Sequence, residues 1–580
     1  MNSQEKTDLQ KVLDLCRESF ISAGAFSLFI NLLMLVPAFY MLQVYDRVIS
    51  SGSMTTLVML TLIMLFLMGT MGSLEWVRSR ILVRVSTRMD VLLGNRLYDV
   101  SFKRSLYTGG AQSTAQPLQD LNGLRNFLSG SGLFAFFDAP WLPVYLLVMF
   151  LFHPLMGMIG LIAAIVLATV AIANEKMTSK PLAEANKAHM IASAATTTNL
   201  RNAEVIEAMG MLPKVRGRWE EQNHKVLFWQ AKASDRAGIF TSLSKTIRVS
   251  VQSFILGVGA YLVIQQEITP GLMIAGSILL GRALSPIDQM IGAWKGFVAA
   301  RGQYARLNEL LIKIPPTPQK MTLPEPAGAI SAERAVITPP GAQAAVVKGV
   351  SFQISPGEIV GIIGPSASGK STLARGILGI WPTVGGAIRI DGAESASYNR
   401  EELGPFIGYL PQDIELFDGS VSENIARFGE VDAEQVVQAA KEAGVHEMVL
   451  GLPQGYDTVI GQSGGILSGG QRQRIGLARA LYGNPSIVLL DEPNSNLDEQ
   501  GEKALNSAIE SLRQKACTTL MITHRASVLS QVQKLMLVND GLIVGFGPRD
   551  EVLRKIKAAQ TQTLAVAGSS PDQPSQIKKG

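Results

Sequence analysis

The chain has 580 residues, of which 47% are hydrophobic and only 17% are charged, and its formal net charge is +5. A soluble domain averages roughly 25% charged residues, so this composition excludes a protein that is soluble along its whole length. The length exceeds what one hydrophobic core supports. The two cysteines lie far apart in the sequence, and no disulfide framework is readable.

Six apolar runs in the first half of the chain predict six membrane-spanning helices, because a bilayer core takes about 20 apolar residues per helix. The runs cover residues 21–44, 53–74, 133–154, 155–173, 249–264 and 272–294. The third run carries one charge, Asp138. The last carries Arg282 and Asp288, which either face the interior of the helix bundle or mark this span as partly cytosolic.

Lys and Arg gather in two long polar segments, residues 77–132 and 175–246, whereas the other turns between spans are nearly bare of them. The positive-inside rule places both segments and both termini in the cytosol. Apolar residues recur at helical spacing at Ile81, Val85 and Met89, so we expect the spans to continue as cytosolic helices. Membrane topology accounts for the basic residues better than a nucleic-acid surface does.

The chain divides by composition into five parts. Residues 1–20 are an amphipathic segment that either lies on the inner membrane surface or packs into a core. Residues 21–313 form the transmembrane domain and its cytosolic helical extensions. Residues 314–329 are a proline-rich linker, and residues 330–562 alternate short β-rich runs with helices, as in an α/β domain. We expect the tail, residues 563–580, to be disordered.

A phosphate-binding loop opens the α/β domain. The apolar run EIVGIIG leads into GPSASGKST, which fits G-x-x-x-x-G-K-[ST] between a strand and a helix. Backbone N–H groups at such a helix N-terminus face the phosphates, the lysine neutralises them, and the serine hydroxyl suits Mg²⁺. We therefore predict nucleotide contacts at Gly364, Pro365, Ser366, Ala367, Ser368, Gly369, Lys370, Ser371 and Thr372.

The apolar stretch SIVLLDEP predicts a buried strand that ends in two carboxylates, Asp491 and Glu492. A solvated strand end is the alternative, and it is disfavoured in a chain that already has a phosphate loop. We expect Asp491 to hold Mg²⁺ and Glu492 to polarise the attacking water, because phosphoryl transfer needs mainly positioning and neutralisation.

The stretch LSGGQ resembles the signature sequence of ATP-binding-cassette proteins. In that family the signature contacts the γ-phosphate held by the other subunit. The resemblance implies that Ser468, Gly469, Gly470 and Gln471 complete the site of a second copy. One cassette and six spans per chain then imply a homodimer that hydrolyses ATP.

The same resemblance assigns three further residues. Gln412, in GYLPQDIELF, corresponds to the glutamine that senses the metal and couples to the membrane helices. His524, in LMITHR, corresponds to the switch histidine at the γ-phosphate; a purely structural histidine is the alternative. Asp498 ends SNLD, the loop that communicates across the dimer. The catalytic residues are then Glu492, His524 and Gln412, and the metal ligands Ser371, Gln412 and Asp491.

Six spans before one cassette resemble the ABC exporter half-transporters. The stretches FFDAPWLPVY, PAFYMLQVYDRVISSGS and DEPNSNLD are similar to the type I secretion ATPases of Gram-negative bacteria. That resemblance implies a multi-pass protein of the inner membrane with its cassette in the cytoplasm. It would export unfolded polypeptides with an uncleaved C-terminal signal, together with a periplasmic adaptor (membrane fusion) protein and an outer-membrane channel.

Two other classes of function stay open. One is a lipid, glycan or small-molecule exporter of the same architecture. The other is a soluble cassette ATPase acting on nucleic acid or ribosomes, which the six apolar runs argue against. Only about 20 residues precede the first run, so we expect no N-terminal peptidase-like domain, unlike in the haemolysin-type and bacteriocin-type relatives.

The sequence departs from the family in two places. No aromatic residue occurs from Ser331 to Val350, where cassettes usually stack one on adenine. The segment VIGQSGGI before the signature lacks the usual glutamate. A third feature, Asp46 and Arg47 between the first two spans, is either part of an adaptor-docking site or an ion pair that closes the turn.

Overall fold

A computed structural model describes residues 6–109, 115–130, 132–316, 322–461 and 467–567. The chain forms two compact units, each described here by itself: a membrane unit of residues 1–104 and 113–315, and a cassette unit of residues 105–112 and 316–580. The expected linker and the segment VIGQSGGI lie partly outside the described residues, as does the tail from residue 568 onward.

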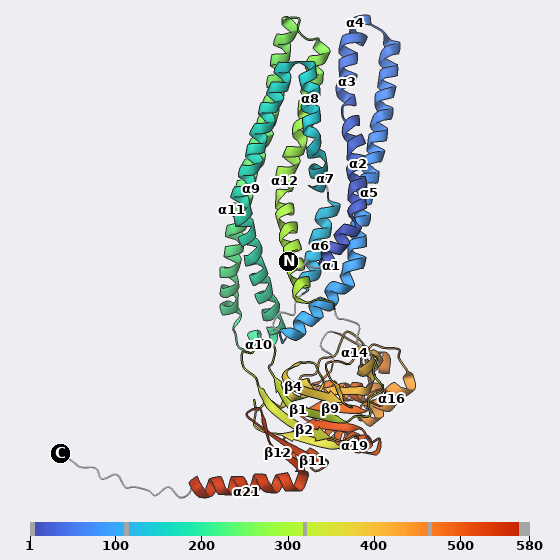
Figure 1. Cartoon of the computed structure of the whole chain (residues 1–580), viewed down its shortest axis with the longest axis vertical. Coiled ribbons are helices and arrows are strands. Elements are labelled where there is room, and N and C mark those ends of the chain that lie inside the picture. The colour runs from blue at the N-terminus through green and yellow to red at the C-terminus, as the bar shows by residue number, and fades with distance from the viewer. Residues whose placement is uncertain (1–5, 110–114, 131, 317–321, 462–466, 568–580) are drawn as a thin grey trace, which may run out of the picture. The chain divides into compact units, whose positions relative to one another are not determined.

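Within the described residues, the regular elements of the membrane unit are all helices (Figure 1). Six of its helical stretches are long and apolar enough to cross a bilayer, which confirms the predicted spans: Arg17–Ser51, Met54–Tyr107, Gly132–Phe152, Pro154–Arg201, Leu212–Ile264 and Pro270–Lys313. Its helices are α1 (Asp8–Leu15), α2 (Arg17–Leu33), α3 (Val36–Gln43), α4 (Ile49–Ser51), α5 (Met54–Tyr107), α6 (Gln116–Ser129), α7 (Gly132–Asp138), α8 (Leu142–Phe152), α9 (Pro154–Arg201), α10 (Ala203–Ala208), α11 (Leu212–Ile264) and α12 (Pro270–Lys313).

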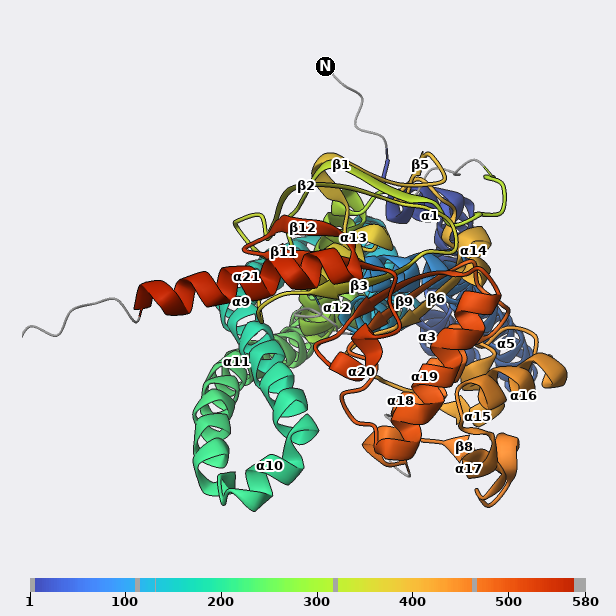
Figure 2. The ribbon, with the colours of Figure 1, turned by 90° about the horizontal axis from the view of Figure 1, so that it is seen from below.

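The spans continue well beyond the bilayer, as expected. Helix α5 has 54 residues, which at 1.5 Å per residue corresponds to about 80 Å, against about 30 Å of hydrocarbon. Helices α9 and α11 run side by side, and the short α10 joins their ends (Figures 1 and 2). The described parts of the two long polar segments are therefore mainly helical, and much of them extends the spans.

Two spans are interrupted at prolines, which the apolar pattern did not predict. The third span consists of α7, a 3₁₀ turn at Ala139–Trp141, and α8. The first consists of α2, α3, a π-helical turn at Val44–Val48, and α4. Pro140 lies within the break in the third span. Proline favours a break because it lacks the backbone N–H that would continue the helical hydrogen bonds.

The N-terminal segment packs into a core, which decides between its two interpretations. Leu9, Val12 and Cys16 are buried in a cluster with residues of α5, α6 and α12. Helix α1 begins with a capping box between Thr7 and Gln10, which satisfies the N–H groups of its first turn.

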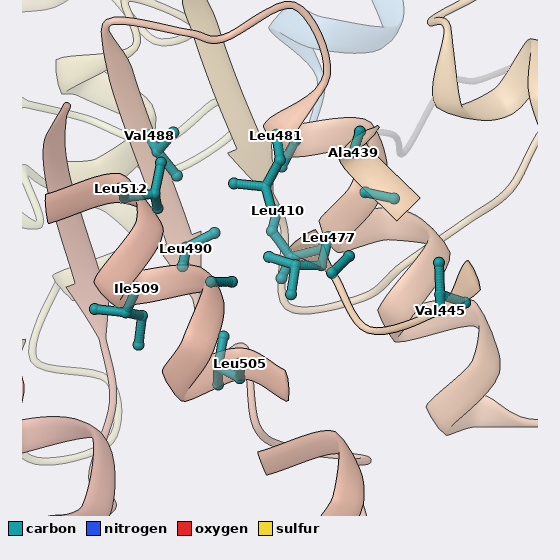
Figure 3. Packing of buried hydrophobic residues seen from close by; sticks show 14 of the residues in the cluster. Leu410, Ala439, Val445, Leu477, Leu481, Val488, Leu490, Leu505, Ile509 and Leu512 are labelled. Atoms are coloured by element: carbon teal, nitrogen blue, oxygen red, sulfur yellow. The ribbon is translucent and has the colours of Figure 1, made fainter. Parts of the chain in front are cut away.

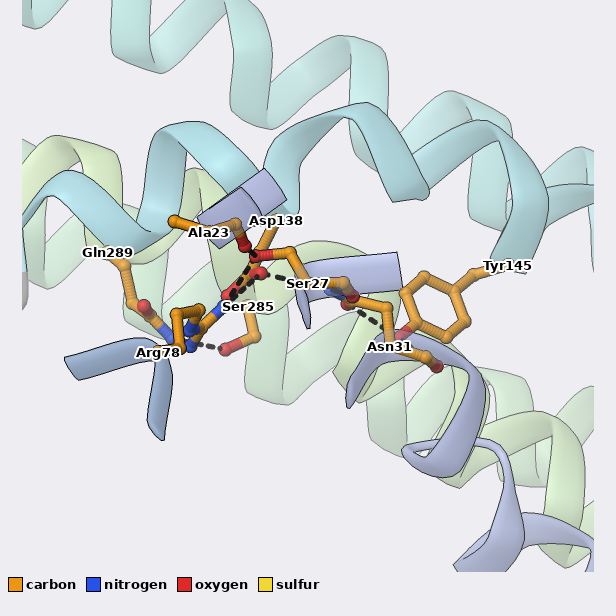
Figure 4. A network of polar contacts seen from close by, with 8 residues as sticks. All are labelled: Ala23, Ser27, Asn31, Arg78, Asp138, Tyr145, Ser285 and Gln289. Carbon is orange, nitrogen blue, oxygen red and sulfur yellow. Dashed lines mark hydrogen bonds and ion pairs between the residues drawn. The ribbon is translucent and has the colours of Figure 1, made fainter. Parts of the chain in front are cut away.

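A buried polar network surrounds Asp138 (Figure 4). The Asp138 carboxylate accepts hydrogen bonds from Arg78 of α5 and Asn31 of α2, each at 2.9 Å. Arg78 also donates to the hydroxyl of Ser27 at 2.8 Å, and Tyr145 of α8 donates to Asn31. The one charge of the third span is thus compensated inside the bundle.

The charges of the last span point in different directions. Asp288 faces the interior, where it forms an ion pair with Arg248 of α11 at 2.5 Å and accepts a hydrogen bond from Ser244. Arg282 is exposed. The interior orientation expected for both charges is therefore correct for Asp288 only.

The Asp46 carboxylate is hydrogen-bonded to the last span and is not paired with Arg47. Its carboxylate accepts hydrogen bonds from the backbone N–H of Gly271, at 2.8 Å, and from the Thr269 hydroxyl, at 2.5 Å. These groups form the first turn of α12. The ion pair between Asp46 and Arg47, one of the two alternatives for this turn, is absent from the described residues, where the carboxylate binds the helix N-terminus instead.

The cassette is built on a six-stranded sheet in the order β12-β11-β3-β10-β9-β6, in which only the β12–β11 pair is antiparallel. A second, antiparallel sheet has the order β2-β1-β4-β5. The strands are β1 (Ile330–Ile337), β2 (Val347–Ile354), β3 (Ile359–Ile363), β4 (Thr383–Ile390), β5 (Ala393–Glu394), β6 (Ile407–Leu410), β7 (Gly419–Ser420), β8 (Val459–Ile460), β9 (Ile487–Asp491), β10 (Thr518–Ile522), β11 (Lys534–Asn539) and β12 (Leu542–Pro548).

Hydrophobic cores cover both faces of the main sheet. On one face, leucines and isoleucines of α18 (Gly469–Leu481) and α19 (Glu499–Gln514) pack on β6 and β9 (Figure 3). On the other face, α13 (Lys370–Ile377) and the antiparallel sheet pack on β3 and β10. The remaining helices are α14 (Arg400–Leu403), α15 (Val421–Ile425), α16 (Ala433–Glu442), α17 (His446–Leu450), α20 (Ala526–Leu529) and α21 (Arg549–Ala567).

The last helix overlaps the tail that was expected to be disordered. Helix α21 continues to Ala567, so residues 563–567 are helical. The stretch TQTLAVA contains no glycine or proline, and the first such residue after it is Gly568.

Candidate nucleotide site

Four parallel strands bring the predicted site residues to one edge of the main sheet. Ile362 of β3 pairs with Ile522 of β10, Ile522 pairs with Asp491 of β9, and Leu490 of β9 pairs with Leu410 of β6. The carboxyl ends of these strands therefore align, which is where open α/β sheets bind ligands. The residues that follow the strands are the Gly364 loop, His524, Glu492 and Gln412.

The phosphate loop has the backbone that its glycines predict. Gly364 has φ +154°, and a Cβ there would lie 2.0 Å from the carbonyl oxygen of Val538. Gly369 has φ +101° and forms the N-cap of α13. The turn thus leaves the N–H groups of the first turn of α13 directed at the loop, where an anion binds favourably.

The other predicted residues of the phosphate loop differ in their exposure to solvent. Pro365, Ser366 and Ala367 are exposed at the tip of the loop, whereas Ser368 and Thr372 are buried. The hydroxyl oxygen of Ser368 is buried with no hydrogen-bond partner among the described residues. A buried hydroxyl without a partner is costly, and it fits a loop whose partner is the anion.

Lys370 lies over the loop. Its Nζ donates to the carbonyl oxygens of Gly364 at 2.9 Å and Pro365 at 2.8 Å. Burial lowers the pKa of the Lys370 ammonium group, and the nearby carboxylates of Glu492 and Asp491 oppose that shift. Lys370 is therefore held where its charge can neutralise phosphate oxygens.

The carboxylate of Asp491 fits a divalent cation. The side chain is 2% exposed, and its Oδ1 has no hydrogen-bond partner among the described residues. Burial raises the Asp491 pKa, while a hydrogen bond from Ser371 opposes the rise. A carboxylate oxygen beside a serine hydroxyl is an oxygen pair of the kind that Mg²⁺ prefers.

Glu492 follows in an uncommon backbone conformation. Its φ is +50°, and its N–H donates to the carbonyl oxygen of Ile522 at 2.9 Å. Left-handed backbone is rare for glutamate and persists only where neighbouring groups hold it. The side chain is half-buried, whereas Gln412 and His524 are exposed at the same edge.

Gln473, which the sequence did not single out, holds this loop. Its amide Nε2 donates to the carbonyl oxygens of Pro493 at 2.5 Å and Glu492 at 3.3 Å. Its Oε1 accepts from the N–H of Asn496 at 3.1 Å. Gln473 is 2% exposed, and it lies four residues after Gly469 on the same face of α18. The four-residue spacing from Gly469 was the only feature of the sequence that could have indicated this role of Gln473.

The signature residues form the start of α18. The Ser468 hydroxyl accepts from the N–H of Gln471, and the Gln471 side chain accepts from the N–H of Ser468. A Cβ on Gly470 would lie 2.8 Å from the carbonyl oxygen of Asn496, so glycine permits this close packing. Across the described residues, no hydrogen bond joins this helix end to the chain's own phosphate loop.

The loops after β9 and β10 are tied to each other. The Thr523 hydroxyl, just before His524, donates to Asn494 at 3.1 Å. Asp498 is the N-cap of α19 and accepts from the N–H of Gly501 at 2.7 Å. The loop that carries Glu492 is therefore held by β10, by α18 and by its own helix cap.

Comparison with known proteins agrees with both units. The "ABC transporter transmembrane region" family model matches residues 20–285, and the "ABC transporter" model matches residues 347–495. A structure of a bacterial Atm1-family ABC exporter with ATP bound superposes with a TM-score of 0.81, over 96% of this chain and 99% of that one. At 21% sequence identity this likeness concerns the fold alone.

Relatives of known name cover nearly the whole chain. The type I secretion system ATP-binding protein PrsD of Rhizobium meliloti (strain 1021) is 44% identical over 94% of both proteins. The leukotoxin export ATP-binding protein LtxB of Aggregatibacter actinomycetemcomitans is 29% identical over 93% of this chain and 77% of its own length. The chain therefore belongs to the type I secretion ATP-binding proteins of the ABC exporter family, multi-pass membrane proteins whose ATP-binding cassette couples ATP hydrolysis to transport.

Proposed function

We propose that this chain works as a homodimer in the bacterial inner membrane and exports unfolded polypeptides that carry a C-terminal signal. It would act with a periplasmic adaptor protein and an outer-membrane channel. The observation that carries the dimer is the arrangement of the signature. Ser468 and Gly470 stand at the start of α18 with no hydrogen bond to the chain's own phosphate loop among the described residues.

The residues at the sheet edge have separate roles in this proposal. Mg²⁺, when bound, supplies positive charge that neutralises the phosphates of ATP. Ser371, Gln412 and Asp491 would hold the ion, and Lys370 and the loop N–H groups would bind the phosphates. Glu492 orients the attacking water, and His524 contacts the γ-phosphate.

The polypeptide cargo is proposed from the relatives and from the motifs. The proteins named above are a type I secretion ATP-binding protein and a leukotoxin export protein. The outer turns His153 and Gln265–Thr269 are short, so the chain has no outer domain of its own at these turns to receive cargo. An adaptor and channel would fill that role.

The cargo is tested by secretion from cells that express the protein with its adaptor and channel. A candidate cargo should reach the medium intact, and deletion of its C-terminal segment should stop export. Cells that carry the Lys370→Ala variant are the matched control. Export that continues without the segment, or lipid flipping by the purified protein alone, would contradict the polypeptide cargo and favour the lipid exporter.

The composite site is tested with two inactive variants, Ser468→Arg and Lys370→Ala. Each variant alone should be inactive, because every site in its homodimer lacks one half. Mixed dimers should regain hydrolysis, since one of their two sites combines an intact loop with an intact signature. Full hydrolysis by isolated monomeric cassettes would rule out the composite site.

A further inference from the structure

The six apolar runs contain three charged side chains, and two of them are neutralised. Asp138 pairs with Arg78 at 2.9 Å, and Asp288 pairs with Arg248 at 2.5 Å. The third, Arg282, has neither an ion pair nor a hydrogen bond among the described residues. An unpaired arginine at membrane depth is costly and marks a functional surface by default.

Apart from Arg282 and Gln289, the exposed polar side chains of the six apolar runs are hydroxyls, among them Thr70, Ser73 and Thr169. Over the described residues of the six apolar runs, Arg282 and Gln289 are the only exposed side chains that are charged or carry an amide. Both lie on α12, seven residues apart, and this spacing returns to the same helix face within about 20°. Ser285 lies between them and accepts a hydrogen bond from Gln289 at 3.0 Å. We call this set, Arg282, Ser285 and Gln289, the donor face.

The donor face is unsuited to lipid. An arginine at the centre of a spanning helix is costly to insert into a bilayer. Exposed residues on α9, for comparison, include Ile162, Ile165 and Ile172, which suit hydrocarbon. The donor face therefore requires water, a second copy of the chain, or cargo.

A dry contact between two copies is disfavoured by charge. A two-fold axis presents the same patch on both subunits, so Arg282 would meet groups of its own kind. The donor face offers a guanidinium, an amide and a hydroxyl, and it contains no carboxylate. The nearby Asp288 is not available to neutralise Arg282, because its carboxylate already binds Arg248 and Ser244.

An extended polypeptide is complementary to this face. Every residue of an unfolded chain carries a backbone carbonyl oxygen, which must find a donor away from bulk water. Acidic side chains would add a partner for Arg282. The network drawn in Figure 4 includes Ser285 and Gln289 together with the buried pair Arg78–Asp138, so one side of the donor face adjoins a fixed polar cluster.

We propose that the donor face of α12 lines the route of the exported polypeptide and hydrogen-bonds its backbone during passage. This inference rests on the proposed function, because it takes an unfolded polypeptide as the cargo. It adds the chemistry of recognition: donors for carbonyl oxygens, and one cation that favours acidic cargo segments.

Photocrosslinking of a stalled cargo tests the proposal in the full-length protein with its adaptor and channel. A photoreactive amino acid replaces Gln289, and a control variant carries it at Ile165 of α9, whose side chain is 57% exposed. The cargo is fused to a rapidly folding domain so that it stops during export. We expect adducts with the cargo at position 289 and none above background at position 165.

Three results would overturn the donor face as the route: adducts at position 289 mainly with a second copy, equal cargo labelling at both positions, or no cargo adduct at either. The unmodified protein separates this failure from that of the proposed function. If it secretes cargo while position 289 gives no adduct, only the donor face is wrong. If it secretes no cargo at all, the proposed function fails first.

Charge reversal gives a second, independent measurement. Arg282→Glu should reduce export of an acidic cargo about tenfold or more relative to Arg282→Lys, because like charges brought together across a contact are strongly unfavourable. A neutral cargo should be affected less by the same change. Equal export of both cargoes by Arg282→Glu and Arg282→Lys would contradict a cationic contact.

Discussion

The side-chain amide of Gln473 donates a hydrogen bond to the backbone carbonyl of Pro493 at 2.5 Å, across 20 positions of sequence. Through this bond the helix that begins with the signature holds the loop that carries Glu492. In the proposed composite site the two elements would serve different nucleotides, since the signature would face the phosphate loop of a second copy. Gln473 is therefore placed to couple the two sites of a dimer through one chain.

Replacement of Gln473 by leucine should lower kcat for ATP hydrolysis while the KM for ATP changes little. The buried carbonyl oxygens of Glu492 and Pro493 would lose their donor, at a cost of about 1–3 kcal/mol. The phosphate loop, which binds the nucleotide, is not touched. Steady-state kinetics measure both constants, and Gln438→Ala, an exposed change on α16, is the control. A raised KM with unchanged kcat would exclude a positioning role.

Glu492→Gln should bind ATP and hardly hydrolyse it. The amide keeps the shape of the side chain but lacks the charge that polarises water, and removal of one such group commonly costs on the order of 10²–10⁴ in rate. Nucleotide binding and turnover are measured on the same preparation. Near-normal turnover would move the catalytic role to another residue.

Base selectivity should be loose. No aromatic residue is present between Ser331 and Val350 to stack on adenine, and such stacking contributes roughly 0.5–1.5 kcal/mol between protein side chains. Because a tenfold difference in affinity is about 1.4 kcal/mol, GTP should compete with ATP within about tenfold. A competition assay with labelled ATP measures the ratio. Strong preference for ATP would mean that a residue elsewhere reads the base.

Removal of Arg78 alone should destabilise the membrane unit more than removal of Arg78 and Asp138 together. The single change Arg78→Met leaves the Asp138 carboxylate buried without its cation, at about 3–5 kcal/mol. Adding Asp138→Asn removes the stranded charge. Thermal unfolding of the purified full-length protein compares the variants, with Arg80→Met as control. A double variant less stable than the single would show that the pair is net stabilising.

The thiol of Cys517 should be unreactive in the folded cassette at pH 8. Burial raises its pKa to about 11. The thiol is therefore protonated below that pH, and the thiolate is the reactive form. Alkylation followed by mass spectrometry should find Cys517 modified only after unfolding. Rapid modification of the folded protein would show that this part of the core opens readily.

The sequence predicted those parts of the fold that depend on local pattern. Hydropathy is counted along the chain, so the six spans could be read directly. The phosphate loop was recognised because strand, glycines, lysine and helix are contiguous. Asp491 and Glu492 were recognised because they end an apolar run that predicts a buried strand.

Long-range contacts between polar groups could not be read in the same way. Asp46 contacts Gly271, and Gln473 contacts Pro493, yet no local pattern marks either pair. The interruption around Pro140 shows a different limit, since proline occurs both within continuous helices, as at Pro286 of α12, and at breaks. Packing, which the sequence does not state, decides between the two.

The bonds from Asp46 to the first turn of α12 have a mechanical consequence for transport. They fasten the outer end of the first span to the outer end of the last one. Separation of the two ends would break the hydrogen bond between the Asp46 carboxylate and the Gly271 N–H. We therefore expect these ends to move together during transport, and we expect bending of the first span at its interruption between α2 and α3, next to Pro37.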